Sequence, residues 1–309
     1  MKANKLVFNV ISLCALLLVG ISSAHAQATR TWVSGVGDDA NPCSRTAPCK
    51  TFAGAISKTA ASGEIDALDP GGFGAVTITK AITIDGETGN LAGVLVSAGN
   101  GITVNAGASD VVVIRNLTIN GVGGGARGIS FLAGAALHVE HCSIFKFLSP
   151  GIDFEPSAAG STLSVKDTFI RDNVAGGILV RPTGVGSARV AVDGVRLERN
   201  TYGMRVEDNS QVTVRNSLAA SNTNNGFLAV SLGSALELNL ETCVATNNGT
   251  NGIVVQGAAA TIRITNCTVT DNNRGLFVSI SGQIISYGNN RIGGNTTSDG
   301  APTTTISQQ

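Results

Sequence analysis

The 309 residues carry 21 basic and 21 acidic side chains, so the formal net charge is zero and no basic excess is present to neutralise phosphates. Nucleic acid and anionic membrane surfaces are therefore excluded as expected partners. Only 14% of the residues are charged and 4% are aromatic, but 43% are hydrophobic, which favours a buried core over disorder.

The first 26 residues have the layout of a secretory signal peptide. Lys2 and Lys5 precede an apolar run over 6–19, and small residues then predict cleavage between Ala26 and Gln27. The apolar run is short for a membrane span, and no later segment reaches the ~18 apolar residues that a transmembrane helix needs. We therefore expect a secreted protein, periplasmic or extracellular, without a membrane span after signal removal.

A disulfide is predicted in the segment that follows, residues 27–63. A strand is expected over 32–37, and the loop after it contains Cys43 and Cys49 beside prolines. In an oxidising compartment these two cysteines are expected to pair. Metal binding is the alternative, but no histidine or second cysteine pair accompanies them, so we expect no metal site.

An amphipathic helix is predicted over 51–60. Phe52, Ala55 and Ile56 fall on one helical face, and Gly63 follows shortly after. A stack of strands would leave its first edge open, so this helix is expected to cap the N-terminal end of the core.

A short phrase recurs through the rest of the chain, with an apolar residue followed by a turn-forming residue two positions later, a second apolar residue at five and asparagine at eight. Its first residue returns every 22 to 27 positions, at Ile114, Val139, Val165, Val192, Val214, Leu240, Ile264 and Tyr287. The turn position is occupied by Asn116, His141, Asp167, Gly194, Asn216, Thr242, Asn266 and Asn289. Asn, Asp, Gly and His tolerate positive φ, which predicts a left-handed bend there, with Thr242 as the exception. The asparagines predict a ladder of stacked amides at Asn173, Asn200, Asn222, Asn248, Asn272 and Asn295.

The length of the repeat decides the fold class. About 25 residues hold three short strands but leave no room for a crossover helix, which excludes a βαβ sheet. Leucine-rich repeats would need a leucine pattern that is missing, and propeller blades are longer. We predict an all-β, single-stranded parallel β-helix, or solenoid, of about ten coils over 64–295. A polar and mobile C-terminal tail is expected over 296–309.

Two stretches carry a resemblance to a known superfamily. Residues 252–255 and 262–267 have the Gly-Ile-x-Val and Ile-x-Ile-x-Asn-Cys phrasing, and residues 50–71 are similar to a cap helix and first strand. This phrasing resembles the repeat of the pectin-lyase-like superfamily, over roughly residues 50–295, and implies a right-handed β-helix. The resemblance is specific for fold only, because lyases, hydrolases, epimerases, phage spikes and adhesins share it.

The catalytic phrases of that superfamily are missing from the repeat region, and no cofactor is expected. One polar cluster lies on three successive coils, within ~10 Å, and is the candidate catalytic site: Asp153, Glu155, Arg181, Arg205 and Glu207. Carboxylates and arginines in this arrangement would suit an acidic-basic polysaccharide site. The alternative is an ion-pair network that only offsets its own charges.

An apolar strip is expected on the outside of the same strands. Its members recur at one register position: Leu179, Leu228, Val254 and Phe277. Exposed apolar surface of this kind marks a contact, either with the chain's own loops or with another copy in a homo-oligomer. Cys142, Cys243 and Cys267 also share a register position and are expected to be buried thiols, with a Cys243–Cys267 disulfide as the alternative.

Three functions remain open at this point. The first is a secreted scaffold with a structural or surface-interaction role, which fits the missing catalytic phrases and the apolar strip. The second is a carbohydrate-active enzyme, most plausibly a polysaccharide lyase. The third is binding of polysaccharide without catalysis.

Overall fold

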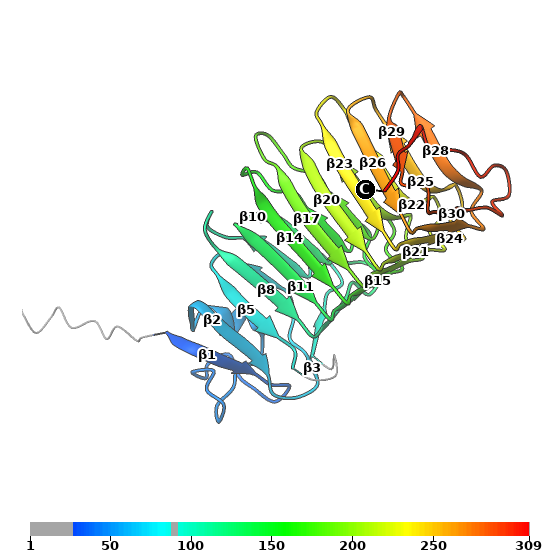
Figure 1. Cartoon of the computed structure of the whole chain (residues 1–309). Helices are drawn as coiled ribbons and strands as arrows, with labels where there is room; N and C mark the ends of the chain where they lie inside the picture. The colour runs from blue at the N-terminus through cyan, green and yellow to red at the C-terminus, as the bar shows by residue number, and fades with distance from the viewer. Residues whose placement is uncertain (1–26, 88–91, 309) are drawn as a thin grey trace, which may run out of the picture.

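The computed structural model describes residues 27–87 and 92–308. These residues form three β-sheets, and the strands within each sheet are parallel. The predicted signal peptide, residues 1–26, lies outside the described residues, which begin at the exposed Gln27 directly after the predicted cleavage point. Between residues 59 and 292 successive strands pass from sheet to sheet in a fixed cycle, so each complete coil contributes one strand to every sheet, and the coils stack into a rod (Figure 1).

The strands alternate between the three sheets in a fixed order. The long sheet contains β1 (Ala28–Val33), β2 (Thr59–Ala67), β5 (Ile82–Asp85), β8 (Val111–Arg115), β11 (Ala136–Glu140), β14 (Ser161–Lys166), β17 (Ala188–Asp193), β20 (Ser210–Arg215), β23 (Leu236–Glu241), β26 (Ala260–Thr265), β29 (Gln283–Ser286) and β31 (Thr304–Thr305). The second sheet contains β3 (Gly71–Gly72), β6 (Ala92–Leu95), β9 (Leu117–Asn120), β12 (Ser143–Phe145), β15 (Phe169–Arg171), β18 (Arg196–Glu198), β21 (Leu218–Ala220), β24 (Val244–Thr246), β27 (Thr268–Thr270) and β30 (Arg291–Ile292). The nine-stranded sheet contains β4 (Val76–Ile78), β7 (Ile102–Asn105), β10 (Ile129–Ala133), β13 (Ile152–Phe154), β16 (Ile178–Val180), β19 (Tyr202–Glu207), β22 (Asn225–Val230), β25 (Asn251–Gln256) and β28 (Arg274–Ser279).

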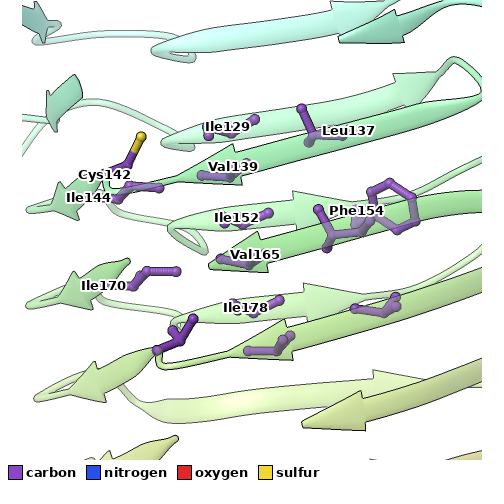
Figure 2. Packing of buried hydrophobic residues seen from close by; sticks show 14 of the residues in the cluster. Ile129, Leu137, Val139, Cys142, Ile144, Ile152, Phe154, Val165, Ile170 and Ile178 are labelled. Carbon is purple, nitrogen blue, oxygen red and sulfur yellow. The ribbon is translucent and has the colours of Figure 1, made fainter. Parts of the chain in front are cut away.

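The parallel β-helix predicted from the repeat is confirmed, with about nine coils among the described residues instead of ten. Equivalent positions pair in register from coil to coil; Val139 pairs with Val165, and Val165 with Val192. Inward side chains therefore stack in columns, and Figure 2 shows Ile129, Val139 and Ile144 of one coil above Ile152, Val165 and Ile170 of the next. Full burial of a Val, Ile or Leu side chain stabilises the fold by about 1.5–3 kcal/mol, so these columns dominate the stability.

The left-handed bend between the long sheet and the second sheet is present at seven of the eight predicted positions. The backbone has φ between 46° and 66° there, with 54° at Thr242. At the eighth position Gly288, not Asn289, adopts positive φ. The bend is therefore imposed by the coil, and Thr242 adopts it despite its branched Cβ.

The asparagine ladder is confirmed as a continuous chain of hydrogen bonds. Asn222 Nδ2 donates to Asn248 Oδ1 over 2.9 Å, and Asn248 Nδ2 donates to Asn272 Oδ1 over 2.8 Å. Each amide oxygen also accepts the backbone N–H of the preceding ladder residue; Asn200 N to Asn222 Oδ1 is 3.0 Å. The ladder thus satisfies backbone groups at the corner before the last five strands of the nine-stranded sheet, β16, β19, β22, β25 and β28.

The N-terminal helix is shorter than predicted. The sequence predicted helix over 51–60, but α2 spans only Phe52–Ile56, with Thr51 Oγ1 accepting from Gly54 N over 2.9 Å. Lys58 N already turns back to Ala55 O, and β2 begins at Thr59 because this segment pairs with β1. Phe52 is buried against Phe73, with ring centroids 5.3 Å apart; the role of the helix as an end cap stays a prediction.

Both ends of the described chain form more β-structure than the sequence predicted. The first strand starts at Ala28, earlier than the expected 32–37, and the loop behind it contains the predicted Cys43–Cys49 disulfide. The expected mobile tail instead continues the last coil, since Gly275 N donates to Ser298 O and β31 pairs with β29. The tail residues are polar but supply backbone groups that the open end of the stack requires. In the described part of the chain no helix is long and apolar enough to span a membrane.

Candidate functional site

The outward side chains of the nine-stranded sheet follow the predicted register. Asp153 of β13 pairs with Leu179 of β16, which pairs with Arg205 of β19. On these three coils the surface is hollowed into a pocket of about 260 Å³. Four of the five candidate residues, Asp153, Arg181, Arg205 and Glu207, line it, so the structure brings together what the sequence grouped. We call this hollow the charged pocket.

Asp153 is the most deeply buried acid of the charged pocket, with 1% of its surface exposed. Its Oδ2 accepts a hydrogen bond from Arg127 Nε, whereas its Oδ1 has no hydrogen-bond partner among the described residues. Burial raises the pKa of Asp153, and the nearby Glu155 raises it further, while Arg127 and Arg181 act in the opposite direction. The carboxyl group therefore holds a proton more readily than an exposed aspartate does.

The two other acids of the candidate set, Glu155 and Glu207, are matched with arginines, although only Glu207 lines the pocket. Arg181 Nε donates to Glu155 Oε1 over 2.9 Å, and this pairing raises the pKa of Arg181. Arg205 Nε lies 2.7 Å from Glu207 Oε1, yet this buried nitrogen makes no well-aligned hydrogen bond. The fold thus leaves part of the hydrogen-bonding capacity of Asp153 and Arg205 unused, which is uncommon for buried polar groups.

Two residues of the charged pocket, Arg127 and Tyr202, were missed by the sequence reasoning. Burial raises the pKa of Tyr202 to about 12, so its hydroxyl stays protonated at neutral pH. Both residues occupy one register position, two residues before the first inward residue of their strands, Ile129 and Met204. The repeat pattern does contain this signal, because both residues lie three positions before an outward residue of their coil, Ser130 and Arg205.

The predicted exposed apolar strip is not exposed. Leu179, Leu228 and Val254 are only 6%, 8% and 5% exposed, and Phe277 is half-buried. Leu228, Val254 and Phe277 lie in register on neighbouring coils and cover one another, together with Val230. Leu179 instead lies between Asp153 and Arg205. The homo-oligomer that was inferred from this strip therefore loses its structural basis.

The cysteines and histidines that could take part in metal binding or catalysis occupy positions that the fold itself explains. In the segments 27–87 and 92–308 no three His, Cys, Asp or Glu side chains are placed to hold a metal ion. Cys142, Cys243 and Cys267 are free and buried, and His141 occupies the left-handed bend 3.5 Å from Asp167 Oδ2.

Comparisons with known proteins agree with this architecture. A family model described as right handed beta helix region matches residues 181–297. The fold is a right-handed parallel β-helix. A solved structure of pectate lyase Pel9A is similar at 16% identity and a TM-score of 0.60, covering 89% of this chain and 79% of that one. The A-module of mannuronan C-5 epimerase AlgE6 from Azotobacter vinelandii is similar at 15% identity and a TM-score of 0.61, covering 76% and 68%. No curated protein matches the sequence.

Proposed function

We propose that this protein is an exported β-helix scaffold that binds an acidic polysaccharide in the charged pocket. The observation that carries the proposal is the pair of buried, incompletely bonded polar groups, Asp153 Oδ1 and Arg205 Nε, in one hollow of the rod. A sugar hydroxyl would donate to the free carboxylate oxygen, and a sugar carboxylate would accept from guanidinium groups. The pocket volume suits one sugar unit of a longer chain.

Two further observations support the proposal. The compared structures are named for enzymes of pectate and mannuronan, which makes polysaccharide the first ligand class to test. Export is supported by the signal-like N-terminus and by the Cys43–Cys49 disulfide, a bond that persists in oxidising compartments.

Titration calorimetry with oligouronates tests this function. Arg205→Ala and Asp153→Asn should each weaken binding about tenfold or more, the effect of losing one charge-assisted hydrogen bond. Arg45→Ala is the matched control, because Arg45 is exposed in the disulfide loop away from the pocket. Unchanged affinity in both pocket variants would disprove the assignment.

Catalysis by Asp153 is the second candidate function. Its raised pKa favours a protonated carboxyl that could donate a proton to a departing sugar oxygen, with Glu207 as a neighbouring carboxylate. Release of reducing ends would reveal hydrolysis, and absorbance of an unsaturated product would reveal a lyase. If the protein is catalytic, Asp153→Asn should abolish turnover while Arg45→Ala keeps it; absence of product from every acidic polysaccharide leaves the binding function alone.

A further inference from the structure

A second hollow runs along the outer face of the long sheet, away from the charged pocket. Three cavities of about 540, 330 and 500 Å³ lie on this face between β11 and β29. Their linings overlap, since Arg189, Gln211 and Glu237 border the first two and Thr213 and Asn239 border the first and third. The cavities therefore form one continuous trough that crosses several coils.

The shape of the trough follows from side-chain size at three register rows. The middle row forms the floor and consists of His138, Ser164, Ala191, Thr213, Asn239 and Arg263. Its four central members, from Ser164 to Asn239, have short side chains. Longer side chains stand on either side, Arg189, Gln211 and Glu237 on one and Lys166, Arg215 and Glu241 on the other. Six strands spaced ~4.8 Å apart give the trough a length of ~24 Å, the size of a short oligomer.

The direction and polarity of the trough restrict what can lie in it. It runs across the strands, whose backbone groups are already paired, so a peptide cannot bind there by adding a strand. The floor and walls offer hydroxyl, amide, guanidinium and carboxylate groups, and these suit a ligand with many hydroxyl groups. A linear polysaccharide lying along the axis of the rod meets both conditions.

The charges of the walls specify the kind of polysaccharide. Asp193 pairs with Arg215 over 2.9 Å, and Glu237 pairs with Arg263 over 3.2 Å. Arg189 forms no ion pair within the described part of the chain, although it is exposed and borders two of the cavities. Lys166 on the other wall is also exposed and forms no ion pair among the described residues, and the same holds for the acid Glu241 beside the third cavity. The two free cations, Lys166 and Arg189, are complementary to carboxylates of the ligand.

We propose that this trough is a second carbohydrate site, which binds a linear, carboxylate-bearing polysaccharide along the long sheet. The charged pocket is lined by residues of the nine-stranded sheet and its borders, and none of them lines the trough. The trough therefore does not depend on the function proposed for the pocket. It would hold several sugar units, whereas the pocket has space for about one.

Binding of an oligouronate long enough to cross the trough tests the proposal, with a neutral oligoglucose of the same length as comparison. Arg189→Gln should weaken oligouronate binding about tenfold, and Ala191→Glu, which fills the floor and repels a carboxylate, should reduce it further. Ala191 and Arg189 are exposed, so both variants should unfold at the wild-type temperature.

The two sites are separated by ligand length and by variant. A diuronate should be affected by Asp153→Asn but not by Ala191→Glu, whereas the long oligouronate should respond to Ala191→Glu even when Asp153 is already replaced. Unchanged affinity of the long oligouronate for Ala191→Glu would overturn the trough as a site. Equal affinity for the neutral oligoglucose would overturn the assigned ligand class.

Discussion

The asparagine ladder and the charged pocket are two groups of polar side chains in the same part of the β-helix, and they differ in how completely their polar atoms are hydrogen-bonded. In the asparagine ladder, Asn173, Asn200, Asn222, Asn248 and Asn272 are at most 2% exposed, and each amide is bonded to its neighbours. In the charged pocket, Asp153 is equally buried, but its Oδ1 has no hydrogen-bond partner among the described residues, and Arg205 Nε lies 2.7 Å from Glu207 Oε1 without a well-aligned hydrogen bond. The contrast is between a closed polar network and an open one.

This difference separates polar groups that stabilise the β-helix from polar groups that are available to bind a ligand. A buried polar network that is fully bonded strengthens and specifies the coil, because each member supplies what the next requires. A network that is partly bonded costs stability, and such sites persist where the unused groups serve a ligand. The ladder should therefore matter for folding and the pocket for binding, and the following predictions test that division.

Breaking the closed network should have the largest effect. Asn222→Ala leaves Asn200 N and Leu197 O without their side-chain partners and should lower the free energy of unfolding by about 2–4 kcal/mol. Urea denaturation measures this loss. Asn224→Ala is the control, because Asn224 is exposed and should change stability by less than about 0.5 kcal/mol. Equal stability of the two variants would mean that the ladder is not a closed network.

The left-handed bend is a third feature that repeats along the coils. A substitution there should raise the free energy of unfolding, and by less than the ladder substitution lowers it. Thr242 has φ of 54°, a conformation that asparagine tolerates better than a β-branched residue. Thr242→Asn should therefore raise the free energy of unfolding by about 1 kcal/mol. Thr261→Asn, on the extended strand β26, should give no such gain. A loss of stability in Thr242→Asn would show that the threonine makes contacts that outweigh its strained backbone.

The asparagine ladder and the charged pocket also differ in how much of each could be predicted from the sequence. The bend and the inward apolar residues recur at eight register positions and the ladder at six, so the repeated pattern was enough to predict all three from the sequence. Arg127 and Tyr202 occur once each, and their meeting with Asp153 and Arg205 depends on which coils lie beside one another at that height. The burial of Leu228 and Val254 was missed for a related reason, because in-register neighbours cover each other only once the coils are stacked. Periodic features follow from the sequence, whereas features of a single coil require the stacked structure.

The smallest predicted effect concerns the pH dependence of the open network. The pKa of Asp153 is raised in the folded state by burial and by Glu155, so the fold favours its protonated form. The stability that this carboxyl contributes is fully present below its unfolded pKa of about 3.9 and is lost as the pH rises through its higher folded pKa. Relative to Asp153→Asn, the wild-type protein should therefore gain stability as the pH falls from about 7 toward about 4.

Urea midpoints of the two proteins across that pH range measure the difference, since carboxylates with lowered pKa such as Asp39, Asp172 and Asp193 titrate alike in both. A difference that stays constant with pH would show that Arg127 and Arg181 neutralise Asp153 completely. The charged pocket would then be as closed as the asparagine ladder, and the main reason for assigning it a ligand would disappear. A saturating oligouronate should shrink the pH-dependent difference, because a ligand hydroxyl that donates to Asp153 Oδ1 stabilises the ionised carboxylate.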